Sequence, residues 1–222
     1  MNLDKSFEFF RPDMCDSKIH IIGCGSVGST VAELLARFGL EDFVLYDFDY
    51  VEPHNIVNQM FTAKHIGMPK TEALKQILQD INPDIDPQIE DEGWNGQKLA
   101  GYVFLAVDSI ELRKKIVQEN MYNTNIKGFF DFRTGLTDAQ HYAADWSQMM
   151  HRKAFIGSMN FTDEEAKAQN PVSACNVELC VAPTVRLVST VGVTNFINFL
   201  KKEKLYISIP VEAFKFQIDA IG

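Results

Sequence analysis

The chain has 222 residues and a formal net charge of −9; 46% of its residues are hydrophobic and 23% are charged. This composition is ordinary for a globular protein with a sizeable core, and its acidity argues against nucleic acid as a main partner, because phosphate backbones favour basic surfaces. No apolar run reaches the roughly 18 residues of a membrane span, and the N-terminus lacks a signal-peptide pattern, so we expect a cytoplasmic protein with no membrane partner.

The first part of the chain alternates short apolar runs with helical patterns. The apolar runs predict buried strands over residues 18–23, 43–47, 102–108 and 126–132, with a further short strand over 84–90. Apolar residues at helical spacing predict helices over residues 29–39, 70–83 and 110–121. This alternation indicates an α/β protein of the Rossmann-like, doubly wound type, with a mainly parallel sheet.

The pattern changes after about residue 133. Beyond it we expect an antiparallel strand, a long polar connection with at most two helical turns, a strong helix and two short strands, over residues 138–146, 151–171, 183–202, 205–210 and 213–219. The sheet should therefore end in antiparallel C-terminal strands. Because the sequence contains no repeat or linker, we interpret residues 1–222 as a single domain.

A glycine-rich motif separates the first predicted strand from the first predicted helix. Gly23, Gly25 and Gly28 match G-x-G-x-x-G, in which the first glycine permits a tight turn, the second lets a phosphate approach the backbone, and the third lets the helix pack closely. The helix N-terminus then offers free N–H groups to an anion. Asp47 follows about 20 residues later, where an acidic side chain can reach a ribose hydroxyl. An ATP enzyme and an NAD(P)-dependent oxidoreductase both fit these features.

Polar residues further along the chain favour ATP. The segment YDFDYVEPHNIVNQMF, residues 46–61, places acidic and amide side chains directly after a strand, and a dehydrogenase rarely needs such a loop. Lys70 stands in the first turn of a helix, which is an unfavourable place for a cation unless an anion is near. Asp108 ends an apolar run at the predicted carboxyl edge of the sheet, where such folds bind ligands.

Four segments resemble, in order and spacing, the ThiF/MoeB/HesA family of E1-like adenylyltransferases. They are IIGCGSVGSTVAELLARFGL, DFDYVEPHNIVNQ, IGMPKTEAL and VDSIELR. The resemblance covers residues 18–115 closely and residues 125–222 only in general layout. It implies an enzyme that uses MgATP to adenylate a carboxylate, typically the C-terminal glycine of a ubiquitin-like or sulfur-carrier protein, or of a peptide. It also implies a homodimer.

The same resemblance implies an ATP site whose members come from all four segments. They are Gly23, Gly25, Ser26, Gly28, Asp47, Asp49, Asn55, Asn58, Gln59, Lys70 and Asp108. In such a site Asp47 would hold the ribose, Lys70 would neutralise phosphate charge, and Asp108 would bind Mg²⁺ on the triphosphate. Asp49 would help to fix the loop, while Arg113 is expected to be a structural ion-pair partner.

The chain departs from the family pattern at three positions. Asn58 replaces an arginine, Ser26 replaces a glycine, and Ser109 stands where asparagine is common. Without the arginine the site loses one phosphate contact, which leaves open a non-catalytic relative that only binds nucleotide. Arg11 of the partner subunit in a homodimer would be one replacement; the alternative interpretation of Arg11 is a plain surface residue.

The four cysteines, Cys15, Cys24, Cys175 and Cys180, do not form a disulfide framework in a chain of this length. Many relatives bind zinc through two C-x-x-C pairs, which are absent here, so we expect no zinc. Cys175 lies roughly where some relatives place a cysteine that bonds covalently to the carrier. A buried, inert thiol is the alternative interpretation.

Overall fold

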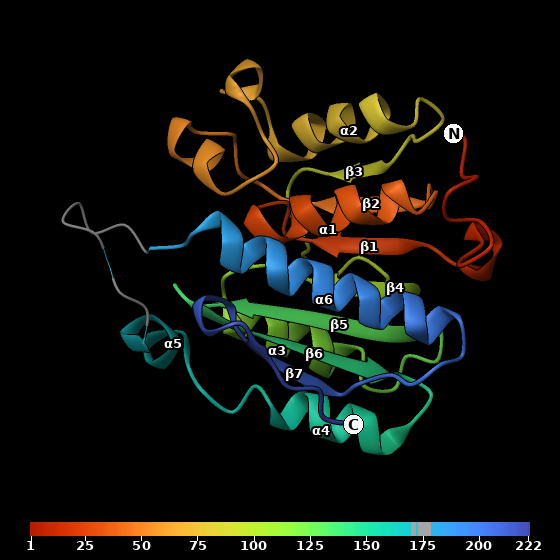
Figure 1. Cartoon of the computed structure of the whole chain (residues 1–222). Helices are drawn as coiled ribbons and strands as arrows, with labels where there is room; N and C mark the ends of the chain where they lie inside the picture. Colours follow the sequence, from red (N-terminus) through yellow and green to blue (C-terminus); the bar gives the residue numbers. More distant parts are fainter. Residues whose placement is uncertain (170–171, 173–178) are drawn as a thin grey trace.

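An eight-stranded sheet forms the centre of the molecule, in the order β3-β2-β1-β4-β5-β6-β7-β8 (Figure 1). The structure is a computed structural model that describes residues 1–169, 172 and 179–222. The parallel strands are β1 (Ile19–Ile22), β2 (Phe43–Tyr46), β3 (Gln88–Glu90), β4 (Gly101–Leu105) and β5 (Ile126–Thr134). The antiparallel strands are β6 (Asp138–Asp145), β7 (Ser208–Glu212) and β8 (Gln217–Ile218). The predicted fold class is therefore confirmed.

Helices cover both faces of this sheet. The first face carries α1 (Ser26–Arg37), α2 (Lys70–Ile81) and α6 (Ala182–Leu200). The second face carries α3 (Ile110–Glu119) and α4 (Met149–Gly157), and α5 (Asp163–Gln169) contacts α3. Short 3₁₀ helices lie in the connections: η1 (Pro12–Met14), η2 (Pro53–Val57), η3 (Ala63–His65) and η4 (Ala213–Lys215). The order of helices and strands is that of a doubly wound sheet.

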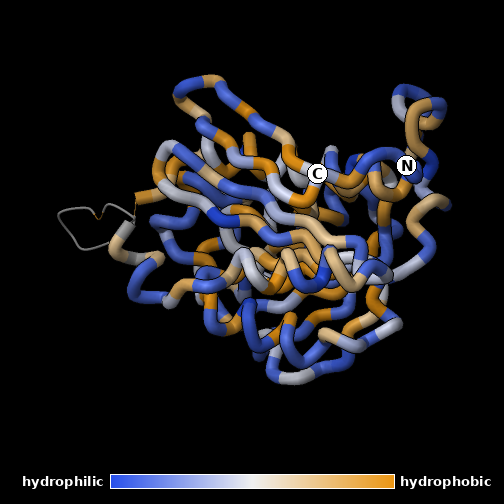
Figure 2. Tube along the Cα trace, turned by 90° about the horizontal axis from the view of Figure 1, so that it is seen from below, coloured by the Kyte–Doolittle hydropathy of each residue, from blue (hydrophilic) through white to orange (hydrophobic). Residues whose placement is uncertain are grey.

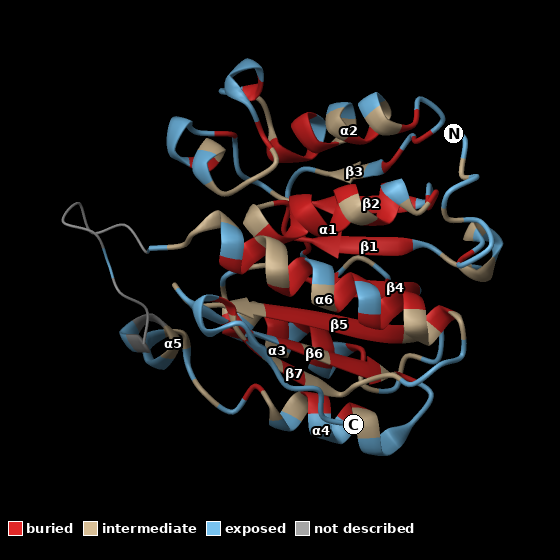
Figure 3. Ribbon diagram, in the orientation of Figure 1, coloured by how far each residue is buried: buried red, intermediate tan, exposed pale blue. Residues whose placement is uncertain are grey.

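The core consists of two apolar layers, one on each face of the sheet. In β4, Tyr102 and Phe104 pack in the first layer, whereas Val103 and Leu105 pack in the second, because successive strand residues point to opposite faces. Phe196 of α6 packs edge-on against Phe104, with the ring centroids 5.1 Å apart. Figure 2 shows the hydrophobic parts of the trace concentrated in the middle of the molecule, and Figure 3 shows the central strands buried.

Several boundaries differ from the sequence-based expectations, three of them as follows. Residues 151–171 are not a largely irregular connection, because α4 and α5 occupy much of this stretch. In α4 only Arg152 and Phe155 are buried; the Arg152 guanidinium donates to the carbonyl oxygens of Trp146 and Met121, so tertiary contacts stabilise a helix with a weak pattern. The last predicted strand, residues 213–219, was also wrong, because η4 precedes a β8 of only two residues.

The third difference concerns α1, which begins at Ser26 rather than at residue 29, so the helix includes part of the glycine motif. Its N-cap residue is Gly25, which has no side chain to cap the first N–H groups. The strand order reverses between β1 and β4, and such a reversal opens a crevice at the carboxyl ends of the two strands. This carboxyl edge lies on the left of Figure 1, where the arrowheads of β1 and β5 point.

Candidate functional site

The glycine loop between β1 and α1 forms one wall of this crevice. Gly23 has a φ of +95°, and a methyl group there would lie 2.7 Å from the carbonyl group of Ala106, just beyond β4. A methyl group at Gly28 would lie 1.8 Å from the carbonyl oxygen of Gly23, so the helix packs directly against the loop. Gly25 has no atom within 4 Å of such a methyl position. The backbone is therefore open to a ligand at Gly25, whereas Gly23 and Gly28 are closely packed.

Asp47, one residue beyond the end of β2, holds this loop in place. Its Oδ2 accepts a hydrogen bond of 2.6 Å from the Cys24 backbone N–H, and its Oδ1 accepts one of 2.9 Å from the Asp49 N–H. Burial raises the pKa of the Asp47 carboxyl, while the positive charge of Lys70 and the two N–H donors oppose that shift. The carboxylate thus joins the glycine loop to the start of the polar loop.

Lys70 is the first residue of α2, and its side chain is only 9% exposed. Its ammonium group lies 2.7 Å from Oδ2 of Asp49, whose side chain is 51% exposed. The Lys70 backbone N–H also donates to the Asp49 carbonyl oxygen. Asp49 therefore ties the polar loop to α2, and the ammonium group of Lys70 lies at the edge of the crevice, paired with Asp49.

The amide side chains of the polar loop have different surroundings. Asn55 is buried, and its Oδ1 accepts the Glu52 backbone N–H within the capping box of η2. Asn58 donates from Nδ2 to the Cys180 carbonyl oxygen at 3.2 Å, so it joins this loop to the segment before α6. Gln59 has a buried Oε1 that accepts no hydrogen bond from the residues described. Gln59 therefore keeps one buried acceptor that no described residue uses.

Asp108 lies in the loop after β4, which ends at Leu105 rather than continuing to Asp108 as predicted. The loop is fixed at both sides: the Arg113 Nε donates to the Val107 carbonyl oxygen at 2.8 Å, and Ser109 caps α3. The Asp108 side chain is exposed, and within the described part of the chain it has no hydrogen-bond or ion-pair partner. Carboxylate oxygens of this kind suit a hard cation such as Mg²⁺.

A second aspartate, which the sequence patterns did not single out, stabilises the loop that carries Asp108. Asp131 of β5 is fully buried and binds Arg113 through Oδ1 and Arg133 through Oδ2, the latter at 2.7 Å. The expectation that Arg113 is a structural ion-pair partner is confirmed. Because Arg113 also binds the Val107 carbonyl oxygen, the buried ion pair fixes the loop that carries Asp108.

Two further residues of this region gave no signal in the sequence. The thiol of Cys180 lies within reach of Asn58, Thr134 and Ser26; burial raises its pKa, those three side chains oppose the shift, and the charge of Asp108 adds to it. Arg186 of α6 directs its guanidinium to the Thr30 hydroxyl and to the Gln59 carbonyl oxygen. Both residues reach the crevice only because the N-terminal half of α6 packs beside α1.

Cys175 lies outside the described residues, so the prediction of a covalent role and its alternative both stay open, as does the absence of zinc. Within the described ranges, no group of three or more histidine, cysteine and acidic residues is placed to hold a metal ion. Cys24 is buried in the glycine loop, and burial raises its pKa well above the ordinary value. None of the helices described is long and apolar enough to cross a bilayer.

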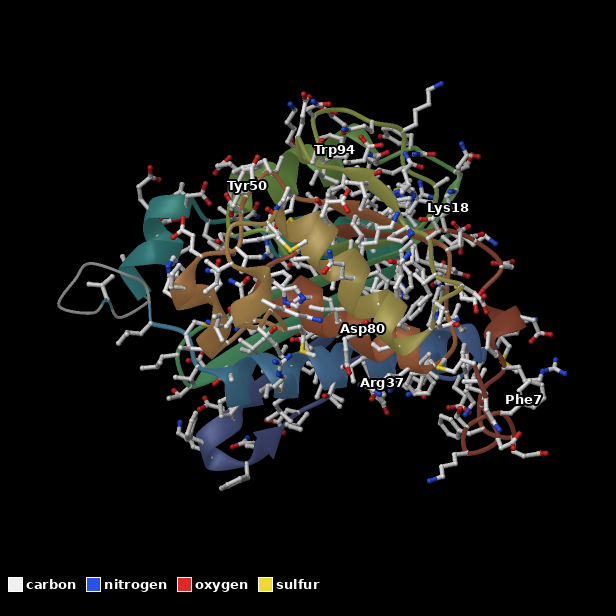
Figure 4. The ribbon with its side chains drawn as sticks, turned by 90° about the horizontal axis from the view of Figure 1, so that it is seen from above. Phe7, Lys18, Arg37, Tyr50, Asp80 and Trp94 are labelled. Carbon is white, nitrogen blue, oxygen red and sulfur yellow. The ribbon has the colours of Figure 1, made fainter. Side chains whose placement is uncertain are left out.

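Arg11 lies at the opposite edge of the sheet. Its neighbour Pro12 packs against Gly39, just beyond the C-terminal end of α1, and α1 extends about 18 Å from the glycine loop to that end. Figure 4 shows Phe7 and Lys18 toward this end of the molecule and Tyr50 toward the other. Arg11 pairs with Asp13 at 3.4 Å. It does not contribute to the crevice of its own chain.

Comparisons with known proteins agree with this geometry. A model of the ThiF family matches residues 8–220. Ubiquitin-like modifier-activating enzyme 5 of Drosophila ananassae is 38% identical over 95 residues, which are 43% of this chain and 22% of that enzyme. The enzyme of the same name from Oryza sativa subsp. japonica is 46% identical over 70 residues, 32% of this chain and 17% of that enzyme. The matched segments thus span less than a quarter of these relatives.

Solved structures extend the likeness to almost the whole chain. E. coli MccB, solved with ATP and also with AMPCPP and MccA, superposes with a TM-score of 0.66 at 19% identity, covering 94% of this chain and 64% of MccB. PaaA superposes with a TM-score of 0.69 at 16% identity, covering 94% of this chain and 65% of PaaA. At these identities the likeness shows a shared fold.

Proposed function

Because the chain belongs to the ThiF family, we propose that it is an adenylyltransferase that uses MgATP to activate a C-terminal carboxylate. The observation that carries this proposal is the convergence of three features at one crevice. They are a glycine loop open at Gly25, the nearly buried cation Lys70, and the carboxylate of Asp108, which has no partner among the described residues. Each answers a different requirement of a bound MgATP: the phosphates, their charge, and the metal.

The residues of the crevice divide the work of binding. The N–H groups at the start of α1 would bind phosphate oxygens, and Asp47 would accept hydrogen bonds from the ribose. Lys70 would exchange part of its contact with Asp49 for phosphate oxygens, which are comparably strong charge-assisted partners. Asp108 would ligate the Mg²⁺ that accompanies the triphosphate, since its carboxylate is exposed and unpaired among the described residues.

In the reaction, a carboxylate oxygen of the substrate forms a bond to the α-phosphorus of ATP. The bond between that phosphorus and the oxygen bridging to the β-phosphate breaks, and pyrophosphate leaves with the electron pair. An acyl-adenylate results. Two anions meet and a third departs, so the site must supply positive charge aligned with the triphosphate. Lys70 and the dipole of α1 would supply it.

The substrate class is also part of the proposal. The relatives include ubiquitin-like modifier-activating enzymes, and E. coli MccB has been solved with MccA. We propose that the carboxylate belongs to the C-terminus of a ubiquitin-like or sulfur-carrier protein, or of a peptide, and that the enzyme is a homodimer in which Arg11 of the partner subunit completes the site. If mixing inactive Arg11→Ala and Asp108→Ala proteins restores no activity, this sharing is wrong.

Two measurements test the proposed activity. Equilibrium titration should give binding of MgATP and none of NADH, and tighter binding of NADH would overturn the proposal in favour of an oxidoreductase. Exchange of radiolabel between pyrophosphate and ATP, with a small protein ending in Gly-Gly as substrate, should then report adenylation. ATP binding without exchange would favour the non-catalytic relative, for which Asn58 in place of arginine is the specific observation.

A further inference from the structure

Arg186 is an arginine beside the crevice whose contacts are all neutral. Its guanidinium donates to the Thr30 hydroxyl, contacts the Met60 thioether and lies 3.5 Å from the Gln59 carbonyl oxygen. Among the described residues no carboxylate forms an ion pair with it. The other arginines of this region, Arg113 and Arg133, share the buried Asp131. Arg186 therefore carries a positive charge that no described residue uses in an ion pair.

The contacts of Arg186 belong to the elements that form the glycine loop wall. The Thr30 hydroxyl donates to the Ser26 carbonyl oxygen at 2.8 Å, and Ser26 is the first residue of α1. The Met60 backbone N–H donates to the Ser29 hydroxyl at 3.2 Å. Thr30 lies about 6 Å along the helix from Ser26, so the guanidinium stands one turn from the open N-terminus of α1.

We infer that Arg186 is a phosphate-binding residue, which supplies from α6 the guanidinium that Asn58 does not supply from the polar loop; this inference rests on the proposed function. With MgATP bound, the guanidinium exchanges its neutral contacts for oxygens of the β- or γ-phosphate. The exchange is favourable because a phosphate oxygen brings a negative charge to the guanidinium, which the hydroxyl, thioether and carbonyl groups do not. The planar guanidinium can also bind two phosphate oxygens at once.

The position of Asn58 fits this assignment. Its amide donates to the Cys180 carbonyl oxygen, just before α6, so the polar loop and the start of α6 are tied together. A guanidinium on either element would reach the same part of the crevice. Lys70 alone is a weak counter-charge for a triphosphate, because Asp49 already shares its ammonium group at 2.7 Å. The guanidinium of Arg186, on α6, is the second cation, in place of the arginine that the polar loop lacks at Asn58.

The experiment is isothermal titration of the full chain with MgATP and, separately, with AMP. Arg186→Gln should weaken MgATP binding by about 10-fold or more, the usual effect of losing a hydrogen bond to a charged group. AMP binding should change less than about 2-fold, since AMP has no β- or γ-phosphate. Arg37→Gln, at the far end of α1 and paired with Glu33, removes the same charge and should leave both affinities unchanged.

A structural role for Arg186 predicts different results. If Arg186 only fastens α6 to α1, Arg186→Gln will weaken ATP and AMP equally and lower the melting temperature, and the inference is overturned. Should that variant fold poorly, Arg186→Lys keeps the charge, and it should bind MgATP with intermediate affinity; affinity equal to that of an uncharged variant would overturn the inference.

The sharpest test is the double variant Asn58→Arg, Arg186→Gln, in which the guanidinium returns to the polar loop. It should recover MgATP affinity to within about 3-fold of the unmodified protein.

Failure of a folded double variant to recover affinity would overturn the inference and leave the proposed function standing. If the unmodified protein binds no MgATP at all, the proposed function fails and the inference with it. The two failures are thus distinguishable, because the first appears only in the variants and the second in the unmodified protein.

Discussion

Two aspartates near the carboxyl edge of the sheet show opposite ways of placing a negative charge. Asp131 is fully buried, and two arginines share its oxygens. Asp108 is exposed, and no cation of the described residues pairs with it. Arg113 joins the two regions, because the guanidinium that binds Asp131 also binds the Val107 carbonyl oxygen. The chain neutralises the carboxylate that supports the fold and leaves unpaired the one that can meet a ligand.

The largest effect should come from breaking the buried member of this pair. Asp131→Asn removes the charge between Arg113 and Arg133 while keeping the shape of the side chain, so both guanidinium groups lose their ion pair. Breaking a buried pair in this way costs about 3–5 kcal/mol of unfolding free energy. Urea unfolding followed by circular dichroism measures it. A loss of unfolding free energy below about 1 kcal/mol would contradict the conclusion that the ion pairs of Asp131 stabilise the fold.

The buried region should also determine how the protein responds to acid. The side chain of Asn195 accepts the Tyr206 N–H through Oδ1, so its amide nitrogen faces His141 Nε2 at 3.2 Å. His141 Nε2 must then be an acceptor, with the ring proton on Nδ1, which donates to the Asp131 carbonyl oxygen. The imidazole is neutral in this arrangement. Burial lowers its pKa to about 4.

The sign of the effect follows from that lowered pKa. The unfolded chain takes up a proton on His141 near pH 6.5 while the folded chain does not, so the stability present above pH 6.5 is lost as the pH falls toward 4. The loss amounts to about 3 kcal/mol at pH 4. His141→Gln should lose less unfolding free energy between pH 7 and pH 4.5 than the unmodified protein. If the unfolding free energy of His141→Gln falls between pH 7 and pH 4.5 as steeply as that of the unmodified protein, the role of His141 is refuted.

At the exposed member of the pair, function rather than stability should change. Asp108→Asn keeps the shape and removes the charge that would ligate Mg²⁺, so pyrophosphate exchange at saturating MgATP should fall by about 100-fold or more, at least about 2.7 kcal/mol of transition-state stabilisation. The melting temperature should stay within a few degrees of the unmodified protein. Near-normal exchange in a folded Asp108→Asn protein would show that Asp108 is only a polar loop residue.

The smallest free-energy change among these predictions is expected for Asp49→Asn, and it concerns stability. Asp49 pairs with Lys70, but its side chain is half exposed, so solvent and salt screen the pair. The unfolding free energy should fall by less than about 1 kcal/mol, and by less still in high salt. Urea unfolding at low and high ionic strength tests this. If Asp49→Asn loses as much unfolding free energy as Asp131→Asn, solvent exposure does not explain how much each carboxylate contributes to stability.

The parts of the molecule that the sequence predicted are those encoded locally. Strands β1, β2, β4 and β5 are short apolar runs, and α2 and α3 have a helical period. The family resemblance inferred from four motifs is confirmed by a match over residues 8–220. Strand ends were less certain: the apolar run continues through Ala106 and Val107, beyond Leu105, the last residue of β4 that pairs with β1, so β4 was predicted to end three residues too late.

The parts that escaped prediction depend on contacts between distant segments. Arg186 and Cys180 lie more than a hundred residues from the glycine loop and meet it only because α6 packs beside α1. Asp131 is one polar residue within an apolar strand, and nothing local indicates that two arginines enclose it. α4 has two buried residues, so its helical period is faint. These features follow from tertiary packing, which a reading of local pattern does not contain.

The pairing of β1 with β4 has a consequence for the order of folding. Thr134 of β5 pairs with Ala139 of β6, so this hairpin closes over a few residues, whereas Ile19 of β1 pairs with Tyr102 of β4 across β2, α2 and β3. Closing the longer loop costs more chain entropy before any contact compensates for it. Gly23 and Asp108 stand on the two sides of that late junction. We therefore expect the hairpin of β5 and β6 to acquire its hydrogen bonds before β1 pairs with β4, and the two sides of the proposed nucleotide site to come together late in folding.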